Sequence, residues 1–198
     1  MNNDMASQST TNERRSFFRV DDKVLLRYQP VDESCALANL IPAAFKEDPG
    51  YSLMQQLQAI DRNNAVFLRA IGEENRDLEA YLKGQNKKLE LIAAKVIEHK
   101  GKAPDQKKQQ ISISEGGLSI QSDTQLANNG YLALQITLLP KHHTLVVFAK
   151  VINCSRAREG GYNIALSFTH LKDNDRQLIA KHIMQLQLAQ RRQQTDGN

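Results

Sequence analysis

Three arginines stand within six residues near the start of the chain, in the stretch ERRSFFRVDD (Glu13 to Asp22). Arg15 and Arg19 are four residues apart, a spacing that places both on one side of the chain whether the backbone is extended or helical. In extended form the pair spans about 13 Å, at roughly 3.3 Å per residue. Guanidinium groups bind phosphates and the O6/N7 edge of guanine in bidentate fashion, and they also stack on bases. With Arg14 as a further donor, the cluster predicts an arm that binds an anion.

A second stretch, SISEGG (Ser112 to Gly117), offers a complementary surface. Ser112 and Ser114 share one face of a predicted strand and carry short hydroxyl side chains. Gly116 and Gly117 permit positive φ angles and allow a ligand to approach the backbone closely. A polar surface with few bulky side chains, opposite an arginine arm, suits a flat, anionic ligand that contains purines.

The elements that position these residues are predicted from hydrophobic periodicity. Alternating segments predict about six short strands, with turns at SEGG, NNG, PKHH and REGG, in an antiparallel meander or barrel. The first, KVLLRYQPV (23–31), is expected to stop at Pro30. The others are QISI, LSIQS, YLALQITLL, HTLVVFAKVIN and GYNIALSFTHL. The segment NDRQLIAKHIMQLQLAQRR then predicts an amphipathic helix with Ile179, His182, Ile183 and Leu186 on one face.

Between the first strand and the others lies a segment of different character. Residues 53–99 contain no proline, and their apolar residues recur at helical spacing. One long helix with a break near Gly72 or Gly84 would fit this pattern, and so would two helices. A helix of some 45 residues would run about 65 Å, more than a small barrel can cover. The stripe therefore favours a seam for self-association or a partner, with a helical hairpin folded back on itself as the alternative.

RRSFFR before a strand, then SISEGG, then a barrel pattern and a C-terminal helix resemble the PilZ domain, a bacterial family. The resemblance covers residues 13–32 and 110–192. Its RxxxR motif matches Arg15 and Arg19, and Arg14 gives the extended RRxxxR form. In its [D/N]xSxxG motif Ser114 and Gly117 match, whereas Ser112 holds the Asp/Asn position with a shorter side chain.

This resemblance implies an α+β, mainly β fold: a six-stranded antiparallel β-barrel with a long, coiled-coil-like helical insertion after the first strand and a C-terminal helix. It implies cyclic di-GMP as the ligand, bound by Arg14, Arg15, Arg19, Ser112, Ser114 and Gly117. The insertion (51–100) is similar to that of an oligomeric PilZ variant whose inserted helix builds a coiled-coil tetramer, so we expect a homo-oligomer. Residues 1–12 and 193–198 are expected to be flexible tails.

Composition limits the other classes of function. The chain has 198 residues, a formal net charge of +4 and a charged fraction of 24%, as soluble globular domains have. No apolar run reaches the roughly 18 residues of a membrane span, and the start lacks the apolar core of a secretory signal, so we expect a cytoplasmic protein. Cys35 and Cys154 lack CxxC spacing, which favours free thiols.

The sequence does not favour an enzyme, because no P-loop, GxGxxG or HExxH occurs and no histidine has a nucleophile at a telling spacing. We expect no cofactor and no metal. Nucleic-acid binding is disfavoured because the strands present no exposed aromatic pair. Two hypotheses follow: a cyclic di-GMP receptor or adaptor with an unknown protein effector, and an oligomeric PilZ-like scaffold that binds nucleotide weakly or not at all.

Overall fold

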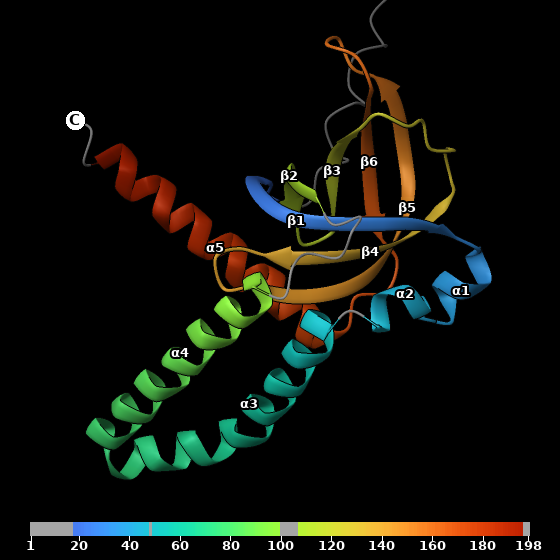
Figure 1. Ribbon diagram of the computed structural model, residues 1–198. Coiled ribbons are helices and arrows are strands. Elements are labelled where there is room, and N and C mark those ends of the chain that lie inside the picture. Colours follow the sequence, from blue (N-terminus) through green and yellow to red (C-terminus); the bar gives the residue numbers. More distant parts are fainter. Residues whose placement is uncertain (1–17, 48, 100–106, 196–198) are drawn as a thin grey trace, which may run out of the picture.

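The computed structural model of the chain describes residues 18–47, 49–99 and 107–195. In chain order, the elements are β1 (Val20–Val31), α1 (Glu33–Leu37), α2 (Ala43–Lys46), α3 (Pro49–Glu74), α4 (Arg76–His99), β2 (Lys107–Ser114), β3 (Gly117–Ser122), β4 (Tyr131–Leu138), β5 (His143–Arg156), β6 (Tyr162–Phe168) and α5 (Asp173–Thr195). Figure 1 shows a barrel with α3 and α4 projecting from one side and α5 crossing one end.

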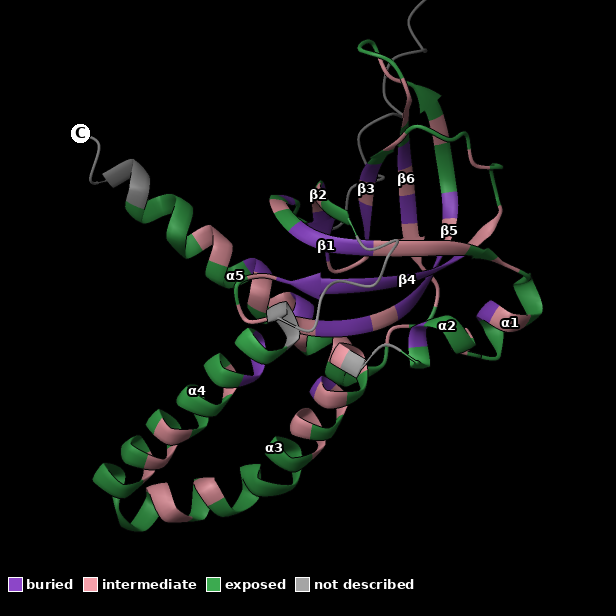
Figure 2. Cartoon of the chain, in the orientation of Figure 1, coloured by how far each residue is buried: buried purple, intermediate pink, exposed green. Residues whose placement is uncertain are grey.

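The six strands close into a barrel in the order β1-β2-β3-β6-β5-β4, and every neighbouring pair is antiparallel. Along each strand, every second side chain points into the barrel, where branched aliphatic residues fill the interior. Fully buried examples come from five of the strands: Val24, Ile113, Leu118, Leu134 and Ile164. Burying each such side chain contributes about 1.5–3 kcal/mol, so this interior holds the barrel together (Figure 2).

β1 is longer than the sequence predicted, because it begins at Val20 and does not stop at Pro30. Residues 20–26 of β1 pair with β2, and residues 25–31 pair with β4. Pro30 is therefore in a stretch bonded on one side only, opposite Leu132. Proline lacks a backbone N–H and is tolerated where a strand has a single neighbour. The expected stop at this proline was wrong for that reason.

The C-terminal helix α5 closes the end of the barrel where β1 begins and β2 turns into β3. Its residues Ile179 and Ile183 are buried in the same core cluster as the inward strand residues. α5 contacts β1 and β2. The predicted apolar face of this helix is thus the face that seals the barrel.

The segment between β1 and α3 contains two short helices, α1 and α2. Phe45 of α2 is fully buried in a small cluster on the outside of the barrel, with Ala36, Ala133 and Phe148. The Arg27 guanidinium lies 4.9 Å from the centre of the Phe45 ring. This second cluster anchors the beginning of the insertion to β4 and β5.

The rest of the insertion is a helical hairpin rather than one continuous helix. α3 ends at Glu74 and α4 begins at Arg76, so the break lies beside Gly72, while Gly84 is inside α4. Asn75 between them caps α4, since the Leu78 N–H donates to the Asn75 side-chain oxygen at 2.9 Å.

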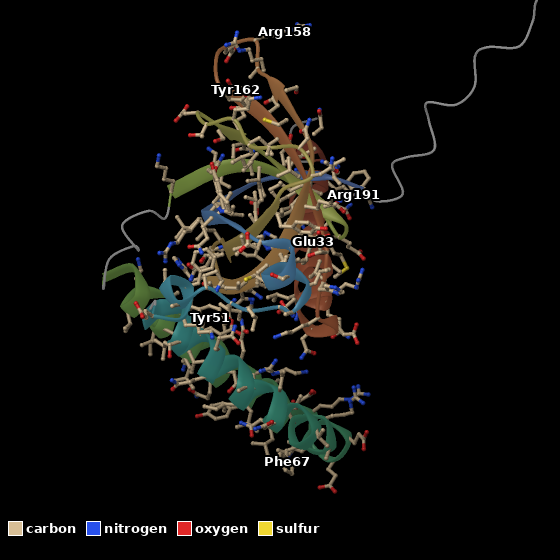
Figure 3. The ribbon with its side chains drawn as sticks, turned by 90° about the vertical axis from the view of Figure 1, so that its right-hand side faces the viewer. Glu33, Tyr51, Phe67, Arg158, Tyr162 and Arg191 are labelled. Carbon is tan, nitrogen blue, oxygen red and sulfur yellow. The ribbon has the colours of Figure 1, made fainter. Side chains whose placement is uncertain are left out.

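The two helices contact each other, with their far ends away from the barrel (Figure 1). Figure 3 shows Phe67 of α3 at one extremity of the molecule, and Arg158, near the β5–β6 turn, at the other.

The expected fold class is confirmed: an antiparallel six-stranded barrel, a long helical insertion after the first strand and a C-terminal helix. The predicted tail over 1–12, residues 13–17 of the arm and residues 100–106 before β2 lie outside the described residues. Among the described helices, none is both long enough and apolar enough to cross a membrane.

Candidate functional site

Arg19, the last residue of the arginine motif, directly precedes β1 and is exposed. Arg14 and Arg15 lie outside the described residues. Phe18 beside it is 70% exposed, so this aromatic side chain does not fill the barrel. The exposed ring next to Arg19 is available for contact with a ligand.

The SISEGG segment forms a two-residue hairpin, as predicted, with Ser114 paired to Gly117 across Glu115 and Gly116. Ser114 is buried, and its hydroxyl donates to the Gly117 carbonyl oxygen at 3.1 Å. This serine holds the turn together, while Ser112 is partly exposed two residues earlier on the same face.

Gly117 is required by a close approach of backbones rather than by its φ angle. A Cβ atom at this position would lie 2.1 Å from the Leu166 carbonyl oxygen of β6, far inside any real contact. Its φ is not positive, and the positive-φ glycines that the structure describes are Gly160 and Gly161. The expectation of a positive φ was therefore wrong for Gly117. A residue without a side chain is needed there because β6 packs too close for a Cβ atom.

Strand register brings four short or polar residues into one row across the outer face of the barrel. Asp21 of β1 pairs with Ser112 of β2, Ser112 pairs with Ser119 of β3, and Ser119 pairs with Ala165 of β6. Directly opposite residues share a face of a sheet. We call this row the platform: Asp21, Ser112, Ser119 and Ala165.

The platform faces outward because its neighbours face inward. Apart from Asp22, the adjoining strand positions on both sides of the row belong to the buried core, namely Val20, Ile111, Ile113, Leu118, Ile120, Ile164 and Leu166. Successive residues of a strand point to opposite faces. Serine and alanine side chains leave a flat strip on which a planar group can lie, and Arg19 stands beside its Asp21 end.

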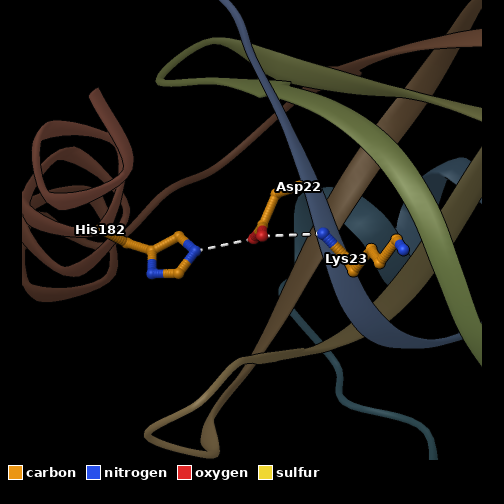
Figure 4. Close-up of polar contacts among 3 residues, drawn as sticks. All are labelled: Asp22, Lys23 and His182. Carbon is orange, nitrogen blue, oxygen red and sulfur yellow. Dashed lines mark hydrogen bonds and ion pairs between the residues drawn. The ribbon is translucent and has the colours of Figure 1, made fainter. Parts of the chain in front are cut away.

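Asp22, next to the platform, is turned the other way and joins β1 to α5. Its Oδ2 lies 2.7 Å from Nε2 of His182, and both side chains are nearly buried, at 10% and 12% exposure. Its Oδ1 accepts the Lys23 backbone N–H at 2.7 Å. Figure 4 shows this pair bridging from the strand to the helix. The contact fixes the orientation of β1 just after the arm.

A cleft of about 380 Å³ lies between Phe18, the β2–β3 turn and α5. It is lined by Phe18, Glu115, Ala180, Lys181, Ile183, Met184 and Gln187. A second hollow, at the opposite end of β2 and β3, is lined by residues that include Arg27, Lys107 and Lys108. Because the platform, Arg19 and the first cleft lie near the same end of the barrel, that end is the candidate site.

The titratable groups with clearly shifted pKa values do not belong to the platform. Burial lowers the pKa of His143 at the start of β5. A hydrogen bond to Glu33 raises the pKa of Tyr131, and burial raises the pKa of Asp175 in α5. Among the residues described, no group of His, Cys, Asp and Glu side chains is arranged to hold a metal ion. The platform itself offers hydroxyls, one carboxylate and an adjacent guanidinium, which is chemistry suited to binding.

The fold defines a class of domain. It is an antiparallel barrel that a C-terminal helix seals and a helical hairpin interrupts after the first strand. The family model of the PilZ domain matches residues 73–185, which is more than half of the chain. The chain therefore belongs to the PilZ domain family. The match begins inside α3 and ends inside α5, so it includes the SISEGG turn and leaves out the arginine arm.

Three solved structures are similar to this chain. The first is a Xanthomonas campestris protein, described as a tetrameric PilZ domain self-assembled via an unusual helical bundle. It is 10% identical with a TM-score of 0.54, and the match covers 88% of this chain and 89% of that one. At this identity the similarity establishes the fold alone.

The second is MotI/DgrA, an inhibitor of motility from Bacillus subtilis, at 13% identity, a TM-score of 0.46, and coverage of 90% of this chain and 54% of that one. The third is Escherichia coli YcgR in complex with c-di-GMP, at 14% identity, a TM-score of 0.40, and coverage of 50% and 44%. The match thus spans about half of each of these two longer chains. No curated protein matches this chain.

Sequence reasoning missed three members of the platform, Asp21, Ser119 and Ala165. All three lie within segments that the sequence analysis had identified, ERRSFFRVDD, LSIQS and GYNIALSFTHL. The signal that finds them is the pairing register, which joins residues about 90 positions apart in the chain, and no local pattern carries it.

Proposed function

We propose that this PilZ protein is a non-enzymatic receptor and adaptor for cyclic di-GMP. Arg14, Arg15 and Arg19 would clamp the phosphates and guanine edges of the nucleotide against the SISEGG side of the barrel. Bidentate guanidinium contacts suit both groups. The observation that carries the proposal is the platform, an outward row of short side chains that ends beside Arg19.

The motif residues divide into two roles in this proposal. Ser112 faces the ligand, because its side chain is on the outward row. Ser114 and Gly117 shape the turn, since the serine hydroxyl already bonds the glycine carbonyl and the glycine lies against Leu166. Ordering the arm costs conformational entropy, which the ionic contacts must exceed. The gain is a switch, because the ligand changes the surface that an unidentified protein effector meets.

Calorimetric titration of cyclic di-GMP tests the receptor proposal. Wild type is expected to bind, and Arg15→Ala/Arg19→Ala to lose most of the heat. Arg156→Ala/Arg158→Ala is the matched control, because it removes two arginines at the far tip of the β5–β6 hairpin. Absence of wild-type binding below about 100 μM, a free energy near −5.5 kcal/mol, would remove receptor function.

A second function, assembly of copies of this chain, is favoured by the hairpin surface. Seven large apolar side chains of α3 and α4 are more than half exposed: Ile60, Val66, Phe67, Tyr81, Leu89, Leu91 and Ile92. All but Val66 and Leu91 belong to the apolar stripe of the insertion. Near the barrel the hairpin buries Met54, Ala93 and Ala94, yet this stripe stays uncovered. Contiguous exposed apolar surface of this kind marks protein interfaces. The Xanthomonas campestris protein of similar fold is described as assembling through a helical bundle, and we propose that a second copy covers the stripe here.

Mass measurement by light scattering tests the assembly proposal. Wild type is expected to be an oligomer, and Phe67→Glu/Ile92→Glu to be smaller because a charge is costly to bury in an apolar seam. Lys88→Glu, at an exposed polar position of α4, should leave the mass unchanged. A wild-type monomer at tens of micromolar would exclude assembly.

We further propose that the protein acts in the cytoplasm. Cys35 and Cys154 are free thiols, as is usual for proteins of a reducing compartment. The boundaries expected from the sequence, with the barrel over 13–32 and 110–192 and the oligomerisation insertion over 51–100, remain part of this proposal.

A further inference from the structure

We infer that Asp21 is a specificity-determining residue, whose carboxylate accepts hydrogen bonds from the Watson–Crick edge of a guanine lying on the platform. This inference rests on the proposed function. Asp21 is exposed at the second position of β1, two residues after Arg19. Its partner in the register is Ser112, the residue that stands where an acidic or amide side chain was expected.

Guanine presents donors on its Watson–Crick edge, the N1–H and the N2 amino group. A carboxylate is an acceptor with two oxygens and can take both donors at once. The other platform residues cannot do so, because Ser112 and Ser119 each offer one hydroxyl and Ala165 offers none. Asp21 is therefore the one platform side chain whose chemistry matches this edge.

The position of Asp21 compensates for the short side chain of Ser112. Residues directly opposite on antiparallel strands have their Cβ atoms about 4.5–5.5 Å apart. A carboxylate at Asp21 thus points from the same face, one strand away from where a longer residue at Ser112 would place its oxygen. Only the strand bearing the acceptor differs, and the acceptor remains beside the flat strip.

The neighbouring Asp22 is excluded from this role by its contact with His182. Its carboxylate is 10% exposed and lies 2.7 Å from the imidazole Nε2. Alternation along β1 then leaves Asp21 on the outward face. The two consecutive aspartates serve different elements, one the helix α5 and the other the open platform.

A carboxylate beside an anionic ligand requires nearby positive charge. Lys23 is exposed on the same face of β1, two residues beyond Asp21, and exposed Arg19 precedes it by two. These two cations flank the carboxylate and offset its repulsion of phosphate. They also orient the ligand, because the guanine edge binds Asp21 while the phosphates are attracted to the positive charges on either side.

Calorimetric titration with two nucleotides, cyclic di-GMP and cyclic di-AMP, tests the inference. Adenine lacks the N1–H, so a carboxylate selects against it. Asp21→Ala is expected to weaken cyclic di-GMP binding by about 10- to 100-fold, as loss of a hydrogen bond to a charged group does. Because the lost hydrogen bonds are made to guanine and not to adenine, the ratio of the affinities for cyclic di-GMP and cyclic di-AMP should fall by a similar factor.

Two further variants separate position from general charge. Asp123→Ala removes an exposed aspartate beyond the opposite end of β3 and should leave binding unchanged. Asp21→Ser/Ser112→Asp moves the carboxylate one strand across, and it should recover most of the affinity lost in Asp21→Ala.

The possible failures are distinguishable. If wild type binds and Asp21→Ala binds both nucleotides as Asp123→Ala does, the inference is wrong while the receptor proposal stands. The inference is also wrong if Asp21→Ala weakens both nucleotides equally, because the carboxylate then acts through charge alone. If wild type binds neither nucleotide, the receptor proposal and the inference fall together.

Discussion

At the scale of single residues, the proposed site combines residues that we propose contact the ligand with residues that the packing of the barrel requires. Ser114 and Gly117 match the family pattern, yet in this structure each has a structural task, one in closing the turn and one in allowing β6 to approach. Loss of binding in variants of these residues therefore does not by itself identify a ligand contact. Arg19, Asp21 and Ser112 have side chains exposed or half-exposed beside the flat strip, and their variants are more informative.

Gly117→Ala is expected to destabilise the fold. The added Cβ would lie 2.1 Å from the Leu166 carbonyl oxygen, so the pairing of β3 with β6 must shift. Strain of this kind costs roughly 1–3 kcal/mol and sometimes more. The free energy of unfolding, measured in urea, would show the loss. Gly84→Ala is the matched control, because beyond the adjoining backbone of α4 no atom lies within 4 Å of its added Cβ, and it should stabilise α4 by about 0.5–1 kcal/mol. Equal stability of the two variants would contradict the packing argument.

At the scale of elements, the apolar pattern of the insertion fits either one long helix or two helices, and the break between the two helices lies at a single residue. Asn75 separates α3 from α4. Its side chain accepts the Leu78 N–H, and its own N–H bonds to the Ile71 carbonyl oxygen at 2.7 Å. The residue thus lies between the end of α3 and the beginning of α4, which runs back towards the barrel (Figure 1).

Asn75→Ala is expected to loosen the beginning of α4. Loss of an N-cap side chain costs about 1 kcal/mol, and the effect should be local because Asn75 lies far from the barrel core. Native-state hydrogen exchange of the first turn of α4 would report it as faster exchange. Asn75→Asp keeps the acceptor and should exchange like wild type. Unchanged protection in the alanine variant would show that packing alone sets the helix start.

At the scale of the whole molecule, one end of the barrel gathers α4, α5 and the start of β5. His143 lies there, partly buried, and its pKa is lowered below 6.5 mainly by burial, with Lys141, Lys181 and His182 adding to the effect and Glu90 opposing it. Groups from separate parts of the chain thus act on one imidazole. The folded state therefore favours its neutral form.

Stability is expected to fall on mild acidification for this reason. A base whose pKa is lowered in the folded state contributes stability that is complete above its unfolded value of about 6.5 and is lost as the pH falls towards the folded value. Thermal unfolding of wild type and His143→Gln between pH 7.5 and 5.5 would isolate the effect. Wild type should lose more stability over that interval, because glutamine does not titrate. Parallel curves for the two proteins would contradict the assignment.

The chain's local patterns were sufficient for most of the architecture. Period-two segments predicted the strands, and the helical stripe predicted the insertion, because alternation and helical spacing follow directly from backbone geometry. These local patterns failed where a residue distant in the sequence determines whether a position is in a strand or is buried. Pro30 remains in β1 because β2 has already separated from that stretch, and Phe45 is buried because β4 and β5 pass beneath α2.

The sequence by itself determined the family, the order of the elements and the motif residues on which the proposed nucleotide site is built, because these depend on residue type and spacing along the chain. Only the tertiary structure decided which of them lie together. The strand register of the closed barrel places Asp21 opposite Ser112, and His182 of α5 pairs with Asp22. The physical reason is that a barrel pairs strands far apart in sequence, so its surface is composed by register rather than by neighbourhood in the chain.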